Sequence, residues 1–61
     1  MDKQSATEIL KIAILLERRG KAFYSTVAKQ TQSKAVKEIF TTLAEEEDEH
    51  IEFLSKQFAH Y

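Results

Sequence analysis

The sequence predicts an all-α protein, an antiparallel hairpin of two helices. Helix-forming residues dominate from about residue 5 to 29 and from about residue 33 to 58, and proline is absent. In both segments apolar residues recur at the spacing of one helix face. The break between them, QTQS at residues 30–33, is short enough to fold the helices back on each other. We therefore expect one domain over residues 1–61, with its turn at 30–33.

Capping signals precede both helices. The sequence SATE at residues 5–8 matches a capping box, in which the serine side chain caps the helix and the glutamate reaches back to the cap. Ser33 can cap the second helix in the same way. We therefore expect the helices to begin close to Ser5 and Ser33.

Composition excludes several classes of protein. The chain has no cysteine, so it can form neither a disulfide nor a zinc–thiolate site. Its net charge is −1, which does not favour nucleic acid or an anionic membrane as a partner. The longest apolar run, residues 9–16, contains Lys11 and is too short to span a bilayer. We expect a soluble, cytoplasmic protein.

The first helix has more apolar surface than one neighbour can cover. At about 100° per residue, one line of contact contains Ala6, Leu10, Ala13, Glu17, Gly20, Tyr24 and Ala28. Further apolar residues flank this line, namely Ile9, Ile12, Leu16, Phe23 and Val27, and Leu15 lies outside even that arc. A two-helix hairpin cannot bury so wide a face. We therefore predict at least a homodimer, forming a four-helix bundle, and the wide face leaves room for a larger ring.

Three polar residues interrupt the apolar lines. In the second helix the line Val36, Phe40, Leu43, Glu47, His50 and Leu54 steps by four and three residues. The other acidic residues of this helix lie on its solvated side, with Glu46 at the edge. Glu17 takes the middle of the first helix's line. Burying an ionised carboxylate without a partner costs several kcal/mol, so Glu17, Glu47 and His50 require compensation.

Three kinds of compensation are open. In a purely structural hairpin, Glu17 would pair with Lys21 one turn on, and Glu47 and His50 would pair with each other or with Tyr24 to fix register. Acid–base catalysis by the two carboxylates is a second interpretation, but no nucleophile or phosphate-binding loop accompanies them. The third interpretation is a metal site.

The spacing favours the metal site. Glu47-x-x-His50 places a carboxylate and an imidazole one turn apart on one helical face, and Glu17 falls at the same level of an antiparallel hairpin. Two hairpins related by a two-fold axis would supply four carboxylates and two imidazoles, the ligand set of a di-iron carboxylate bundle. Manganese and zinc also suit such ligands. We therefore predict Glu17, Glu47 and His50 as metal ligands and catalytic residues.

The segments AILLERRGKAFYSTVAKQ and VKEIFTTLAEEEDEHIEFL resemble the rubrerythrin and ferritin-like superfamily. That superfamily usually has four helices in one chain, and only two are present here, so the sequence is similar to a half-ferritin of the encapsulated type. The resemblance implies a ferritin-like four-helix bundle with a di-iron ferroxidase centre between two subunits. It also implies an encapsulin shell as a partner and compartment.

The resemblance assigns roles residue by residue. It implies that Glu17 is a terminal ligand of one iron, that Glu47 bridges both irons and that His50 is a second terminal ligand. Tyr24 would hydrogen-bond Glu17 of the partner subunit. The expected function is oxidation of Fe²⁺ by dioxygen or peroxide. The alternative is a non-catalytic helical oligomerisation module whose polar residues set register.

Overall fold

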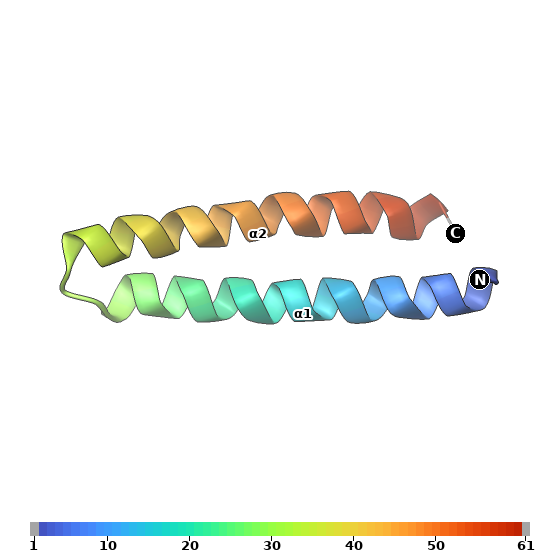
Figure 1. The fold of residues 1–61 in the computed structure, drawn as a ribbon, viewed down its shortest axis with the longest axis horizontal. Helices are drawn as coiled ribbons and strands as arrows, with labels where there is room; N and C mark the ends of the chain where they lie inside the picture. Colours follow the sequence, from blue (N-terminus) through green and yellow to red (C-terminus); the bar gives the residue numbers. More distant parts are fainter. Residues whose placement is uncertain (1, 61) are drawn as a thin grey trace.

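The computed structural model describes residues 2–60 and shows an antiparallel hairpin of two helices, α1 (Lys3–Gln30) and α2 (Lys34–His60) (Figure 1). Met1 and Tyr61, the ends of the predicted domain, lie outside the described residues. The helices run side by side, so the start of α1 and the end of α2 lie at the same end of a rod of 47 × 14 × 13 Å. The predicted all-α hairpin is confirmed.

The first helix begins earlier than its sequence signals suggest. Asp2 is the N-cap, and its carboxylate accepts a hydrogen bond of 2.8 Å from the backbone N–H of Ser5. The predicted capping box at Ser5 is therefore wrong, because Ser5 lies inside the first turn. Aspartate is as good an N-cap as serine, and its earlier position allows an additional turn of hydrogen bonds. The bond from Ala6 N–H to the Asp2 carbonyl, 3.1 Å, closes that turn.

The turn between the helices is held by side-chain hydrogen bonds. Thr31 ends α1 in an extended conformation and donates its N–H to the carbonyl of Val27. The Thr31 hydroxyl accepts from the N–H of Ser33, and the Ser33 hydroxyl accepts from the N–H of Val36 at 3.2 Å. Ser33 therefore caps α2 as predicted. These bonds satisfy polar backbone groups at the helix ends and fix where each helix starts and stops.

The contact between the helices is narrow. Ala28 and Ala44 are the buried apolar residues among residues 2–60, and their small side chains allow a close approach. Next to them, the rings of Phe23, Tyr24 and Phe40 meet edge to face, with centroids 5.8–6.4 Å apart. The other side chains along the line of contact are half-buried, except that of His50, which is exposed. The hairpin thus has a thin apolar contact and little true core.

One side of the hairpin presents a broad apolar surface, which we call the open face. It is formed by large side chains that lie on the same side of the helix contact as His50, at about 100° per residue: Ile9, Leu16, Phe23, Ile39 and Phe53. These side chains are between 52% and 62% exposed. Ile12 and Leu15 are also exposed, further round α1. Large apolar side chains exposed on one side of a protein are typical of an interaction surface.

We expect the folded protein to self-associate through the open face, so that its thermal midpoint rises with protein concentration. Two neighbouring residues offer a matched pair of variants. Ile39→Gln places a polar group on the open face and should weaken association, whereas Glu38→Gln, on the outer side of α2, should not. Melts at several concentrations, with sedimentation at each, measure both effects. A folded 7.1 kDa monomer at micromolar wild-type concentration would contradict the expectation.

Candidate metal centre

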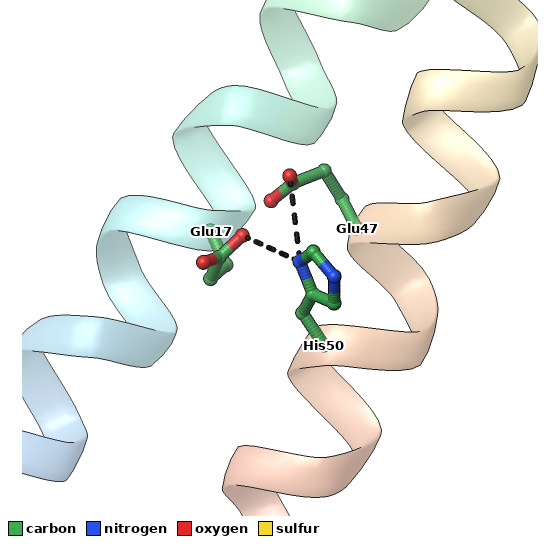
Figure 2. Close-up of side chains that lie close together, drawn as sticks. All are labelled: Glu17, Glu47 and His50. Carbon is green, nitrogen blue, oxygen red and sulfur yellow. Dashed lines mark hydrogen bonds and ion pairs between the residues drawn. The ribbon is translucent and has the colours of Figure 1, made fainter.

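The three polar residues singled out in the sequence come together midway along the hairpin. Glu17 reaches across from α1, and Glu47 and His50 reach from successive turns of α2, so that the three side chains point toward one another (Figure 2). One ligand atom from each lies within 4.8 Å of the others. The two glutamates therefore do lie at the same level, as the residue count on either side of the turn predicts.

The contacts within the group centre on one nitrogen atom. His50 Nδ1 lies 3.4 Å from Oε2 of Glu17 and 3.7 Å from Oε1 of Glu47. The first distance is a long hydrogen bond and the second exceeds hydrogen-bond range. An imidazole nitrogen facing two carboxylate oxygens is the arrangement of a metal site as well as of a loose ion pair.

The three side chains differ in burial. The side chain of Glu47 is 14% exposed, that of Glu17 is 31% exposed and that of His50 is 54% exposed. Glu47 and His50 both face Glu17 of α1, in agreement with the predicted inward direction, but His50 is more than half exposed. His50 lies about 60° round α2 from Glu47, so its ring stands at the edge of the open face, where the hairpin supplies no third wall. The group is thus closed on one side and accessible on the other.

The ion pair that a purely structural role assigns to Glu17 is not formed. The ammonium of Lys21 pairs instead with Asp48 of α2, at 2.5 Å. Both partners are about half exposed, so this bridge contributes at most about 1 kcal/mol. It lies on the side of the hairpin opposite His50, because Lys21 and Asp48 are rotated the other way around their helices. Glu17 therefore keeps His50 as its charged or polar neighbour among the described residues.

Tyr24 lies close to the group but does not join it by a hydrogen bond. Its ring packs against Phe23 and Phe40. A side chain added at Gly20 would lie close both to Cε2 of Tyr24 and to the carboxylate of Glu47. Within residues 2–60 its hydroxyl makes no hydrogen bond to another residue. The hydroxyl is therefore available to a group outside the hairpin.

The donor set suits a divalent first-row metal ion. Carboxylate oxygen and imidazole nitrogen bind such ions at about 2.0–2.2 Å, so two ligand atoms of one ion lie roughly 3–4 Å apart. Atoms within 4.8 Å need only small side-chain rotations to reach that separation. One hairpin nevertheless provides only three ligand residues, and the most exposed of them borders the open face.

The chain belongs to the rubrerythrin family, because the sequence model of that family, rubrerythrin, matches residues 8–61. No curated protein and no solved structure matches the chain. The family match confirms the expected membership of the ferritin-like superfamily and places the chain in a family that binds iron. The Glu17, Glu47 and His50 group lies within the matched residues. Within residues 2–60, neither helix has a stretch long and apolar enough to cross a membrane.

The stability of the metal-free protein tests whether the two carboxylates repel each other. Replacing Glu47 by Gln keeps its shape and removes one of two carboxylates that share a single imidazole. Relief of like-charge repulsion and of desolvation should leave the metal-free protein equally stable or more stable. Denaturant melts of wild type and Glu47→Gln, at matched concentration and in chelator, measure this. If Glu47 is instead a structural partner of His50, the variant should lose about 1–3 kcal/mol.

Proposed function

We propose that two copies of this chain pair through their open faces, bind two iron ions between them and oxidise Fe²⁺ with dioxygen or peroxide. The single observation that carries the proposal is the position of the Glu17, Glu47 and His50 group. It lies at mid-length of the hairpin, on the border of the apolar surface that a second copy would cover. Association would therefore bury the apolar surface and bring two such groups together in one step.

The number of ligands supports a shared site. A di-iron carboxylate bundle uses one glutamate from each of two helices and Glu-x-x-His from each of the other two. One hairpin offers half of that set, namely Glu17 from α1 and the Glu47-x-x-His50 motif from α2. A two-fold axis through the open face supplies the other half. The proposed complex is therefore a four-helix bundle made of two chains.

The resemblance to the rubrerythrin family gives each ligand a role. Glu47, the least exposed of the three, would bridge the two ions. Glu17 and His50 would each bind one ion. Tyr24, with its free hydroxyl, would donate a hydrogen bond to Glu17 of the partner subunit. Packing among Phe23 and Phe40 fixes the direction of the Tyr24 ring.

The chemistry is a balanced two-electron oxidation. Two Fe²⁺ ions each give up one electron, and dioxygen takes up both electrons and two protons to leave as hydrogen peroxide; with peroxide as oxidant the product is two water molecules. The carboxylates stabilise the higher charge of the oxidised ions. The chain has no cysteine, so no rubredoxin-type centre within it delivers electrons. Iron is thus the substrate that enters and leaves.

We also propose that the protein is a half-ferritin of the encapsulated type. A half-ferritin whose centre forms between subunits is what two paired hairpins would be, and a cytoplasmic encapsulin compartment would receive the oxidised iron. The exposed Ile12 and Leu15 lie outside the open face, and they support assembly of such pairs into a larger ring. Manganese or zinc would occupy the same ligands where iron is scarce.

A non-catalytic oligomerisation module is the competing function, and one contact favours it. The 3.4 Å approach of His50 Nδ1 to Glu17 Oε2 could satisfy both groups without metal and fix the register of the hairpin. Metal analysis separates the two functions. Two metals per pair of chains after growth with ample iron supports the oxidase, and metal-free protein under those conditions supports the module.

Substitutions should distinguish the proposed ligands from nearby carboxylates that bind no metal. Replacing Glu17, Glu47 or His50 by Gln should abolish tight binding of two metals and Fe²⁺ oxidation. Glu49→Gln is the matched control, because Glu49 is exposed on the outer side of α2 beside His50. Calorimetry for binding and absorbance of Fe³⁺ for oxidation measure the effects. Equal losses of metal binding and oxidation in Glu49→Gln would mean that the acidic surface of α2 binds metal without a specific site.

Tyr24→Phe isolates the proposed hydrogen bond across the pair. Because the hydroxyl has no partner within the described hairpin, the metal-free protein should keep its stability. Metal affinity should fall by about 10- to 100-fold, the usual effect of removing a hydrogen bond to a metal ligand. A double-mutant cycle with Glu17→Gln should show that the two losses are not additive. Additive losses would mean that Tyr24 acts elsewhere.

A further inference from the structure

Gly20 lies within α1, one turn beyond Glu17, and it is the only glycine in the chain. Its backbone is that of an ordinary right-handed helix, since no glycine within residues 2–60 has a positive φ. Glycine inside a helix destabilises it relative to alanine. No backbone conformation requires glycine at this position, so its distinguishing property is the space that the missing side chain leaves.

That space borders the carboxylate of Glu47. A Cβ atom on Gly20 would lie 3.4 Å from Oε2 and 3.6 Å from Cδ of Glu47, and 3.9 Å from Cε2 of Tyr24. Alanine would therefore fit at van der Waals contact with the carboxylate as it stands. The other oxygen of Glu47, Oε1, faces His50 (Figure 2). Gly20 and His50 thus border different oxygens of the same carboxylate.

The two oxygens of Glu47 consequently have different surroundings. Oε1 belongs to the group that includes Glu17 and His50 and can bind the ion held by them. Oε2 is directed toward the bare backbone of α1 at Gly20. A carboxylate that bridges two ions presents one oxygen to each, so an ion at Oε2 needs open space beside that oxygen. A methyl group at position 20 would occupy part of the space beside Oε2.

We propose that Gly20 is a positioning residue, which keeps the space beside Oε2 of Glu47 open so that this oxygen can bind a second divalent cation. The inference rests on the proposed two-metal function and adds a residue that touches no metal. Because a two-fold axis makes the two cations equivalent, each would bind Oε1 of one chain's Glu47 and Oε2 of the other's. Filling the space beside Oε2 should therefore weaken the binding of both cations and leave pairing unchanged.

The test is a titration of Co²⁺ into the metal-free protein, followed by calorimetry and by the visible absorbance of the bound ion. Gly20→Ala is the variant. Thr26→Ala is the matched control, because Thr26 is exposed on the outer side of α1 and alanine there also favours the helix. Sedimentation of each metal-free protein measures pairing, and thermal melts measure stability.

Wild type and Thr26→Ala should each bind two Co²⁺ per pair of chains. Gly20→Ala should melt at a higher temperature and remain paired. Both of its Co²⁺ ions should bind about 10- to 100-fold more weakly than those of wild type, the range found when the surroundings of a metal ligand are altered. A role limited to helix stability would raise the melting temperature and leave both affinities unchanged.

Three results would overturn the inference. If Gly20→Ala binds both ions like wild type, the space is not needed, and the proposed function still stands. If the variant loses both ions together with pairing, Gly20 acts on association rather than on Oε2. If wild type itself binds fewer than two ions per pair, the proposed function fails and the inference fails with it.

Discussion

A hairpin of two helices can bury only one narrow strip of each, and this constraint shapes everything else in the molecule. Within residues 2–60 the strip buries only Ala28 and Ala44, and seven large apolar side chains remain exposed. A chain of this length buries a small fraction of its surface and is marginal alone. In the proposed pair, covering the open face would supply further stabilisation.

The same constraint explains how acidic groups can occupy the middle of the contact. In a thick core, Glu17 and Glu47 would be isolated from water, and the cost of burying two carboxylates would be prohibitive without a cation. Here the group is closed toward the helices and open at His50, so water can solvate it in the lone hairpin. In the proposed pair, covering the open face would remove that water. Pairing and cation binding would then be coupled, because each would make the other more favourable.

Much of this architecture is predictable from the sequence because it depends on the helical repeat and on the number of residues between each glutamate and the turn. The spacing of Ala13, Glu17 and Gly20 along one face, and the equal distance of Glu17 and Glu47 from the turn, follow from helix geometry alone. The family resemblance rests on the same residues. The hairpin and the meeting of the three polar side chains therefore agree with the prediction, and the roles of these side chains as ligands stay predictions.

The features that sequence reasoning missed depend on competition between equivalent groups. Asp2 and Ser5 are both good caps, and which one starts α1 depends on whether an extra turn can form. Lys21 can reach either Glu17 on its own helix or Asp48 on the other, and the interhelical geometry selects Asp48. The helical repeat alone places His50 on the inner side of α2, yet the exposure of its side chain depends on how many helices pack around it. In each case local spacing allows two outcomes and tertiary contact selects one.

The register of the hairpin links these local outcomes to the Glu17, Glu47 and His50 group. Caps at Asp2 and Ser33 fix where each helix starts, and the aromatic contacts among Phe23, Tyr24 and Phe40 lock the helices against sliding near the turn. A slip of one turn would move Glu47 by about 5.4 Å along α1. That shift exceeds the 4.8 Å that separates the ligand atoms. Glu47 would therefore no longer lie beside Glu17 or beside Gly20. The precision of the group is therefore a property of the whole hairpin, although its three side chains occupy only its middle.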